Sequence, residues 1–274
     1  MAIPLSAPLV LAGAGKMGGA LLEGWLAQGL DPKLVAVQDP GPPDEVRDLL
    51  ARHGIASGPA APTLAAPAGV LVLAVKPQVM DEVLPGLARV VAPGTLVLSI
   101  AAGRTIHNLE RHLPAQSAVV RAMPNTPAAI ARGITVACAN ARVTAAQRHL
   151  TDALLAAVGE VAWVEREDLI DPVTAVSGSG PAYVFLLAEA LAEAGRAVGL
   201  DADLAARLAN ATVSGAGELL HRSDLDPATL RKNVTSPGGT TAAALGVLMA
   251  DDGLGPLMRR AVEAATRRSR ELSG

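Results

Sequence analysis

The chain has 274 residues and a formal net charge of −3, and 50% of its residues are apolar although only 1% are aromatic. This length suits two domains, each with a core filled by Ala, Leu and Val. A nucleic-acid partner is not expected, because few rings are available to stack on bases and no positive field attracts phosphates. Cys138 is the only cysteine, so no intrachain disulfide can form and a reducing cytoplasm is the expected location.

A glycine motif follows the first apolar run, residues 9–12. The motif Gly13-Ala14-Gly15-Lys16-Met17-Gly18 leads into a helical pattern that ends at Gly29. No basic leader precedes it, unlike a secretory signal. A strand, a glycine turn and a helix in this order are the context in which G-x-G-x-x-G indicates dinucleotide binding.

An acidic residue follows the second predicted strand, residues 34–38. Asp39 lies 21 residues after Gly18, where a carboxylate would bind the ribose hydroxyls of NAD. The alternative is that Asp39 only starts the turn at Pro40–Pro43.

Strands and helices continue to alternate as far as residue 164. Wholly apolar strands such as residues 70–75 are typical of a parallel sheet that is covered on both faces. The unusual loops Lys76-Pro77, Ala101-Ala102-Gly103 and 123–127 each follow the carboxyl end of a strand, where open α/β sheets bind ligands. We therefore predict an α/β Rossmann-type domain with a mostly parallel sheet over residues 1–164. Helices are predicted over 44–53, 79–90 and 144–158, and further strands over 96–100, 117–121, 134–137 and 160–164.

The pattern after residue 164 is entirely helical. Ser177-Gly178-Ser179-Gly180-Pro181 opens a long apolar helix that is closed by Gly199, and Asp201 and Asp226 are expected to cap the next two helices. These helices carry more apolar surface than one thin layer can cover. We therefore predict a helical substrate-binding and dimerisation domain over residues 165–274, and a homodimer or a higher oligomer of dimers.

Three uncharged runs could suggest membrane segments. They span residues 54–75, 172–188 and 233–250, and prolines or glycine clusters interrupt each of them. We interpret all three as buried segments of a soluble protein, so no membrane partner is expected.

The last glycine turn, Pro237-Gly238-Gly239, is followed by Thr240, Thr241 and a run of alanines. Threonines are common N-caps and alanine is the best helix former, so this stretch predicts a helix N-terminus. Such an end presents unpaired N–H groups and a partial positive charge, which suit a small anion. The alternative is a capped helix with a structural role only.

Hydrolytic chemistry has little support in the sequence. The five histidines include no pair at metal-ligand spacing, and neither H-E-x-x-H nor G-x-S-x-G occurs. A dinucleotide site and an anion-binding helix remain, and this combination is typical of a hydride-transfer enzyme for a small carboxylate.

The motifs resemble the pyrroline-5-carboxylate reductase family over nearly the whole chain. The resemblance implies a Rossmann domain, a helical dimerisation domain, and NADPH- or NADH-dependent reduction of 1-pyrroline-5-carboxylate to L-proline, the last step of proline biosynthesis. It is carried by residues 13–18, 74–77, 101–103, 168–171, 177–183 and 233–241.

Position by position, the resemblance also implies roles for single residues. Substrate binding falls to Thr240, Thr241 and, more weakly, Glu167. Thr241 would be the catalytic residue, with its hydroxyl near the imine nitrogen. Because an alcohol is too weak an acid to supply the proton, Thr241 would orient and hydrogen-bond the nitrogen. Cofactor contacts are implied at Ala12, Gly13, Ala14, Gly15, Lys16, Met17, Ala74, Val75, Lys76, Pro77, Ile100, Ala101, Ala102 and Asn233.

The chain departs from the family pattern at Asp39. Members that favour NADPH usually carry small hydroxyl or basic residues at this point. A carboxylate about 4 Å from a 2′-phosphate would repel it by roughly 4 kcal/mol per unit charge at an effective dielectric near 20. Asp39 therefore favours NADH, unless it points away and Lys33 or Arg47 reaches in. Two other functions stay open: a reductase of the same architecture for another small carboxylate, and a non-catalytic nucleotide-binding regulator.

Overall fold

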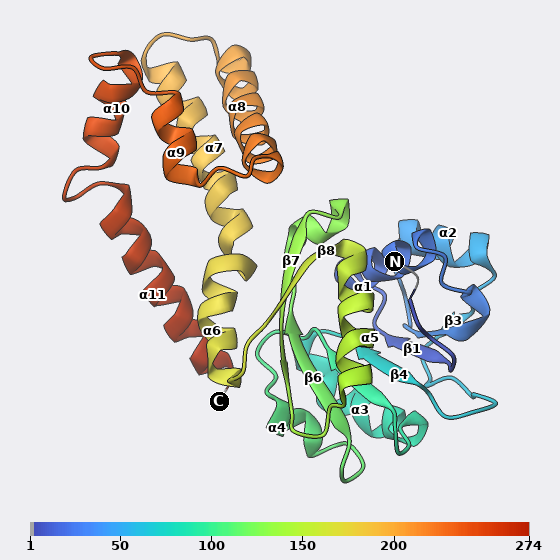
Figure 1. The fold of residues 1–274 in the computed structure, drawn as a ribbon. Coiled ribbons are helices and arrows are strands. Elements are labelled where there is room, and N and C mark those ends of the chain that lie inside the picture. Colours follow the sequence, from blue (N-terminus) through green and yellow to red (C-terminus); the bar gives the residue numbers. More distant parts are fainter. Residues whose placement is uncertain (1–2, 274) are drawn as a thin grey trace. The chain divides into compact units, whose positions relative to one another are not determined.

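The computed structural model describes residues 3–273, which divide into two compact units (Figure 1). The first unit comprises the chain up to Gly178 together with the residues from Thr266 onward, and the second is Ser179–Ala265. The domain boundary predicted after residue 164 marks the end of the strand pattern, whereas the two units are defined by compactness. The predicted boundary therefore stays a prediction.

The first unit contains an eight-stranded sheet in the order β3-β2-β1-β4-β5-β6-β7-β8. Every neighbouring pair is parallel except β6 and β7, which are antiparallel. This arrangement confirms the predicted α/β class with a mostly parallel sheet. The strands are β1 (Leu9–Ala12), β2 (Val35–Gln38), β3 (Ser57–Gly58), β4 (Val70–Leu73), β5 (Leu96–Ser99), β6 (Ala118–Met123), β7 (Gly133–Ala139) and β8 (Gly159–Trp163).

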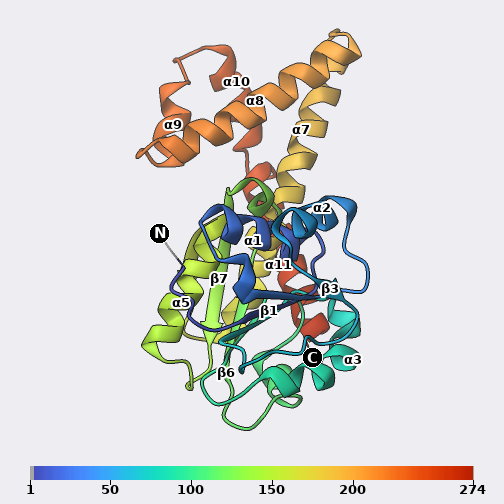
Figure 2. The ribbon, with the colours of Figure 1, turned by 90° about the vertical axis from the view of Figure 1, so that its right-hand side faces the viewer.

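Helices cover both faces of this sheet because alternate strand residues point to opposite sides (Figure 2). Leu9 and Leu11 pack with α1, α2 and α5, whereas Val10 packs with α3, α4 and α6. Trp25 of α1 is fully buried, and its indole N–H donates to the Leu154 carbonyl oxygen at 2.8 Å. The helices are α1 (Lys16–Ala27), α2 (Asp44–His53), α3 (Met80–Leu87), α4 (Ile106–Glu110), α5 (Ala145–Leu155) and α6 (Ile170–Val173).

The second unit is helical. Asp201 caps α8 by accepting from the Leu204 N–H, and Asp226 caps α9 by accepting from the Ala228 and Thr229 N–H groups, so both predicted caps are confirmed. The elements are α7 (Gly180–Ala197), α8 (Ala202–Arg222), α9 (Pro227–Asn233), α10 (Thr240–Leu248) and α11 (Leu254–Ser273), the last of which ends in the first unit.

Large apolar side chains on α7 and α8 are exposed in the single chain. They include Phe185, Leu186, Leu187, Leu208, Leu219 and Leu220. Only Ala175 is buried among residues 172–188, and no residue is buried among 233–250, so the prediction that both runs are buried is wrong for the single chain. A thin layer of helices can cover only one side of each helix.

One helix in the described part of the chain is long and apolar enough to cross a membrane. It runs from Glu167 to Ala197 through α6, a π-helical turn (Thr174–Gly178) and α7, and its most apolar window of 18 residues has a mean hydropathy of 1.3. A long apolar helix that packs against a partner chain has the same length and composition as one that crosses a membrane.

Candidate active site

The glycine turn between β1 and α1 is held tightly by its neighbours. Gly13 has φ of +88°, and a Cβ atom there would lie 2.7 Å from the Ala74 carbonyl carbon. A Cβ atom on Gly18 would collide with the Gly13 carbonyl oxygen. Gly15 differs, because an added Cβ would meet nothing within 4 Å. The protein's own packing therefore requires Gly13 and Gly18, whereas Gly15 leaves open space in front of α1.

The N-terminus of α1 faces that open space with unpaired donors. Its first turn contains no acidic residue, and its N-cap, Gly15, makes no side-chain hydrogen bond. The Gly19 N–H is the first to bond back, to the Gly15 carbonyl oxygen at 2.7 Å. None of the hydrogen bonds among residues 3–273 uses the N–H groups of Lys16, Met17 or Gly18. This geometry fits the pyrophosphate of a dinucleotide.

Asp39 points at the glycine turn and not away from it. Its Oδ2 atom accepts from the Ala14 N–H at 2.7 Å, and its Oδ1 atom accepts from the Gly41 N–H at 2.8 Å. The bond from Gly41 is the turn-starting role that the sequence left open. The bond from Ala14 places the carboxylate beside the dinucleotide motif. The binding of ribose hydroxyls by Asp39 stays a prediction.

The predicted cofactor residues of the first unit lie on one edge of the sheet. The Ala74 N–H donates to the Ala12 carbonyl oxygen at 2.7 Å, and the Ile100 N–H donates to the Leu73 carbonyl oxygen at 2.9 Å. The glycine turn and the loops 74–77 and 100–102 are thus consecutive at the carboxyl ends of β1, β4 and β5. Asn233 belongs to the second unit, as the last residue of α9.

The predicted substrate turn forms the start of α10, with one correction. Thr240 and Thr241 are the first two residues of the helix, and Gly239 is the N-cap. The expectation that a threonine caps the helix is wrong because the Gly239 N–H closes a turn onto the Ser236 carbonyl oxygen at 3.1 Å. That turn places the extended N-cap conformation on Gly239, with φ of −80° and ψ of 175°.

The Thr240 and Thr241 backbone amides are available for an anion. The first N–H of this helix to bond back is that of Ala243, to the Gly239 carbonyl oxygen. No hydrogen bond among the described residues uses the Thr240 or Thr241 N–H group, and the first turn contains no acidic residue. The helix N-terminus predicted from the sequence is therefore present, and both hydroxyls are free of a capping role.

Glu167 already has two strong partners in the first unit. Its Oε1 atom accepts from the Ile106 N–H at 2.8 Å and from the Arg121 guanidinium at 2.9 Å. The Arg121 side chain is only 4% exposed, whereas that of Glu167 is 28% exposed. The weaker substrate role of Glu167 stays a prediction, and this carboxylate also holds the first residue of α4. The sequence does carry one signal for Arg121, because it is the only charged residue in the otherwise apolar strand β6.

Replacing Glu167 with Ala is expected to lower the free energy of unfolding by about 3 kcal/mol, because Arg121 would stay buried without its partner. Urea unfolding measures this. Glu167→Gln should lose much less, since the amide oxygen accepts both hydrogen bonds. Asp168→Ala is the matched control: its carboxylate pairs with Arg166 in full contact with solvent, so no measurable change in stability is expected. Equal stability of Glu167→Ala and the unmodified protein would contradict a supporting role for the ion pair.

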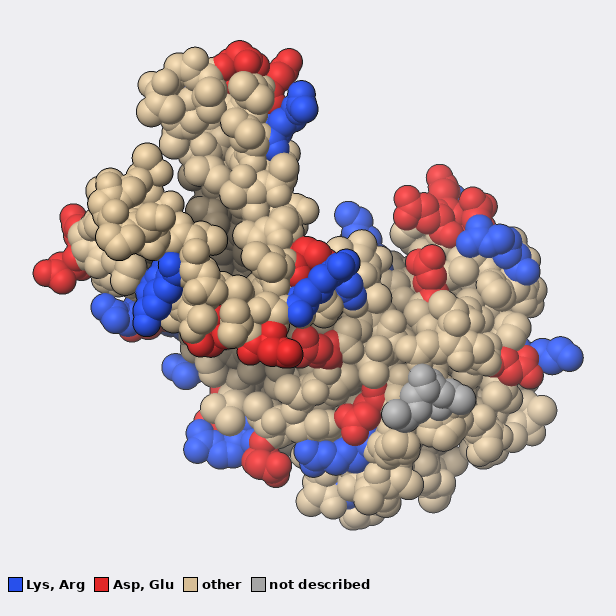
Figure 3. Space-filling view, turned by 45° about the horizontal axis from the view of Figure 1, so that its top comes forward, with Lys and Arg blue, Asp and Glu red and all other residues tan. Residues whose placement is uncertain are grey.

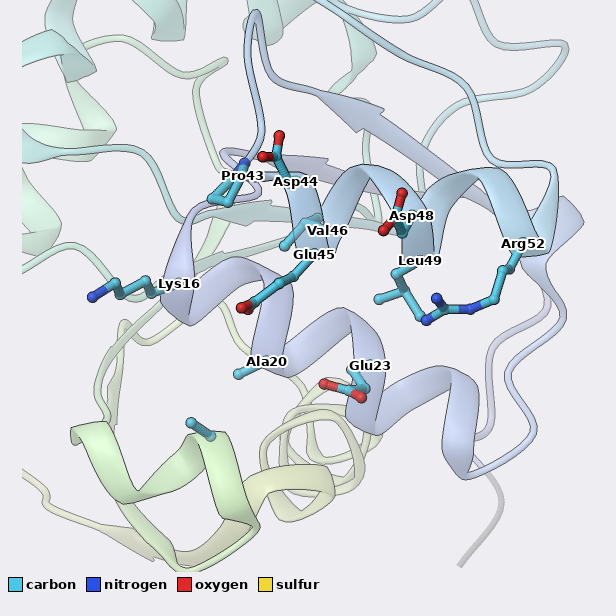
Figure 4. Close-up of a pocket in the computed structure, with 12 residues that line it drawn as sticks. Lys16, Ala20, Glu23, Pro43, Asp44, Glu45, Val46, Asp48, Leu49 and Arg52 are labelled. Atoms are coloured by element: carbon cyan, nitrogen blue, oxygen red, sulfur yellow. The ribbon is translucent and has the colours of Figure 1, made fainter.

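A groove of about 910 Å³ lies between α1 and α2, next to the glycine turn (Figure 4). Its lining includes two basic side chains, Arg52 and the predicted cofactor residue Lys16, and four acidic ones: Glu23, Asp44, Glu45 and Asp48. This acidic lining suits phosphates poorly. On the face drawn in Figure 3, acidic and basic side chains are interspersed, so this face presents no broad positive field. Neither surface offers a cofactor phosphate a stronger site than the backbone amides of α1.

Known proteins resemble this chain along its length. The model of pyrroline-5-carboxylate reductase dimerisation matches residues 167–272, and that of coenzyme F420-dependent NADP oxidoreductase matches residues 9–103. Pyrroline-5-carboxylate reductase of Pseudomonas aeruginosa is 42% identical over 95% of each chain. That of Synechocystis sp. is 42% identical over 98% of this chain and 99% of the relative. The chain belongs to the pyrroline-5-carboxylate reductase family.

Solved structures of the family agree with this membership. The reductase from Coxiella burnetii superposes with a TM-score of 0.90 at 37% identity, covering 98% of this chain and all of that one. The Plasmodium falciparum reductase, solved with NADP bound, gives 0.81 at 29% identity, over 98% and 99% of the two chains. The family confirms the predicted NAD(P)H-dependent oxidoreductase with a Rossmann-type domain and a helical dimerisation domain. The described residues contain no group of three or more His, Cys, Asp or Glu that could hold a metal ion.

Proposed function

We infer that the chain catalyses the reaction of its family, the NAD(P)H-dependent reduction of 1-pyrroline-5-carboxylate to L-proline in the last step of proline biosynthesis. One observation carries the substrate assignment: α10 starts with two threonines whose backbone amides have no partner among the described residues. The substrate is a cyclic imine that bears a carboxylate. A helix N-terminus supplies fixed positive dipoles for such an anion without a charged side chain.

The start of α10 would perform two separate tasks. The backbone N–H groups of Thr240 and Thr241 bind the carboxylate, and the Thr241 hydroxyl hydrogen-bonds the imine nitrogen. A C=N bond accepts hydride readily only when its nitrogen is protonated or strongly hydrogen-bonded, so this donor acts where charge changes in the transition state. The alcohol itself is too weak an acid to give up a proton, which arrives on the substrate iminium or through water.

The cofactor would lie along the carboxyl edge of the sheet. The amides of Lys16 and Met17 and the open space at Gly15 suit its pyrophosphate, and the loops 74–77 and 100–102 form the adjoining surface. Asn233 stays a proposed cofactor contact on the ground of the family resemblance alone. When bound, the reduced nicotinamide supplies the hydride.

We propose that NADH is the preferred cofactor. The Asp39 carboxylate faces the glycine turn through the Ala14 N–H, where a 2′-phosphate on the ribose would meet its negative charge. Arg47 pairs with Asp44, which supports the view that it does not neutralise Asp39. The Plasmodium falciparum relative was solved with NADP bound, so the proposed NADH preference rests on Asp39 of this chain alone.

A homodimer fits the apolar surface of the second unit. The dimerisation model covers α7 and α8, whose exposed leucines and Phe185 would be buried against a second copy. The same burial accounts for the apolar helix Glu167–Ala197 without a membrane. We propose a cytoplasmic enzyme, assembled as a dimer or a higher oligomer of dimers, with no nucleic-acid or membrane partner.

One absorbance assay tests the proposed reaction. Purified protein is mixed with pyrroline-5-carboxylate and either NADH or NADPH, and the loss of absorbance of the reduced cofactor is followed. We expect turnover with at least one cofactor and faster turnover with NADH. A six-membered cyclic imine carboxylate serves as the comparison substrate. Faster reduction of the larger ring would assign the chain to another imine, and no turnover with either cofactor would contradict the proposed reaction.

A further inference from the structure

Arg104 connects two loops that the proposed function assigns to the cofactor. It lies two residues after the loop 100–102, and its side chain reaches back to the end of the loop 74–77. Its Nε and Nη2 atoms both donate to the Pro77 carbonyl oxygen, at 3.1 and 2.6 Å. The two loops are therefore joined by a side chain as well as by the pairing of β4 with β5.

The guanidinium of Arg104 is fixed in orientation by Asp81 of α3. Nη1 donates to Oδ1 at 3.1 Å and Nη2 donates to Oδ2 at 2.9 Å, which is the two-pronged geometry that only arginine makes with a carboxylate. The hydrogen bonds from Arg104 hold the pKa of Asp81 below its ordinary value, so Asp81 is ionised at neutral pH. His112 approaches the same carboxylate, with Nε2 at 3.1 Å from Oδ1. Arg104 thus makes four hydrogen bonds to two acceptor groups.

The loop held by Arg104 also forms one wall of the glycine turn. The peptide between Ala74 and Val75 lies so close to Gly13 that a Cβ atom there would be 2.7 Å from the Val75 nitrogen. A Cβ atom on Gly18 would lie 3.2 Å from the Ala74 Cβ. The loop 74–77 is therefore held by the glycine turn at its start and by Arg104 at its end. A shift of its end changes the surface on which the dinucleotide would lie.

We propose that Arg104 is a positioning residue for the cofactor, which acts by holding the Pro77 carbonyl and so fixes the loop 74–77 relative to the loop 100–102. The inference rests on the proposed function, because that function assigns both loops to the cofactor. Arg104 acts through Pro77, so its loss should weaken cofactor binding and leave the Thr241 end of the substrate site unchanged. A lysine cannot replace it, since one ammonium group cannot hold a carbonyl and both carboxylate oxygens in one plane.

The test compares Arg104→Gln and Arg104→Lys with the unmodified enzyme. NADH affinity is measured by fluorescence titration without substrate, and the KM values for NADH and pyrroline-5-carboxylate are measured separately. We expect the Kd and KM for NADH to rise by roughly tenfold in both variants, the loss expected for hydrogen bonds to a charged group. The KM for pyrroline-5-carboxylate should change by less than about twofold.

Arg142→Gln is the matched control. Arg142 also pairs with a carboxylate, that of Glu110, and bonds a second side chain, that of Gln116, but it lies beyond the end of β7 at the opposite edge of the sheet. Its NADH affinity should equal that of the unmodified enzyme. Asp81→Asn gives an independent test that retains Arg104. It should weaken NADH binding by roughly two- to threefold and add little to Arg104→Gln in the double variant, because both changes break one network.

If Arg104→Gln binds NADH with a Kd within twofold of that of the unmodified enzyme, the inference is overturned, whatever the thermal stability of the variant. This result differs from a failure of the proposed function, because the proposed function is tested by the turnover of the unmodified enzyme alone. If Arg104→Gln does not fold, unchanged NADH affinity in Asp81→Asn and in Arg104→Lys would overturn it equally.

Discussion

Replacing Thr241 with Ala is expected to lower turnover about 10²-fold, a loss of roughly 2.7 kcal/mol of transition-state stabilisation. The hydroxyl is the one side-chain donor proposed to act on the imine nitrogen, and it makes no hydrogen bond among the described residues that would give it another task. The backbone N–H remains in the variant, so carboxylate binding and the KM for pyrroline-5-carboxylate should change little. Steady-state kinetics with saturating cofactor measures both constants.

Two further variants show whether the hydroxyl itself is responsible. Thr241→Ser keeps a hydroxyl on the same backbone and should recover most of the turnover. Thr240→Ala removes the neighbouring hydroxyl while leaving both amides in place, so a much smaller loss is expected. Alanine is a good helix former, and α10 should therefore persist in each variant. Unchanged turnover in Thr241→Ala, or an equal loss in Thr241→Ser, would contradict the assigned role.

The sheet could be predicted because its signals are local. Four-residue runs such as Leu9–Ala12 and Val70–Leu73 are wholly apolar, since helices cover them on both faces. The two-residue strand β3 has no such signal, because Ser57-Gly58 contributes nothing to the core. The loops at the carboxyl edge could be assigned to one ligand site by the same reasoning, as their position follows from strand direction alone.

Long-range contacts of single side chains had no comparable signal. Glu167 and Arg121 are 46 residues apart, and Arg104 lies 27 residues from Pro77, so neither pairing follows from spacing or periodicity. The glycine turn and the alanines predict the start of α10. They do not indicate the hydrogen bond that closes the turn at Gly239, which makes Gly239 the N-cap in place of a threonine. The sequence therefore indicates which residues can bind a ligand better than it indicates which side chains contact each other.

Exposure of the helical unit depends on a partner that a single chain does not contain. The sequence correctly indicated excess apolar surface on helices such as Gly180–Ala197 and predicted a second copy to cover it, and in the single chain this surface is exposed. Periodicity identifies which side of a helix is apolar and does not identify what covers it. The match to a dimerisation domain supports the predicted second copy as that cover.

Replacing Asp39 with Asn is expected to shift the cofactor preference from NADH toward NADPH. A carboxylate about 4 Å from the 2′-phosphate opposes it by roughly 4 kcal/mol per unit charge before salt screening, so the ratio of kcat/KM values should change by about 10- to 100-fold. Asparagine keeps an acceptor oxygen of the same shape, which can preserve the 2.7 Å bond from the Ala14 N–H. The variant therefore removes the charge and leaves the glycine turn in place.

Asp39→Ser separates the charge from the hydrogen bond. Serine also removes the negative charge, but its shorter side chain gives up the contact with Ala14. If charge decides the preference, both variants should shift the NADH to NADPH ratio by similar factors, and only Asp39→Ser should also weaken NADH binding through a looser turn. The shift should shrink at high salt, because an exposed charge is screened over about 10 Å at 0.1 M ionic strength. A ratio that is unchanged in Asp39→Asn would show that the Asp39 carboxylate does not face the 2′ position, although it is bonded to the Ala14 amide.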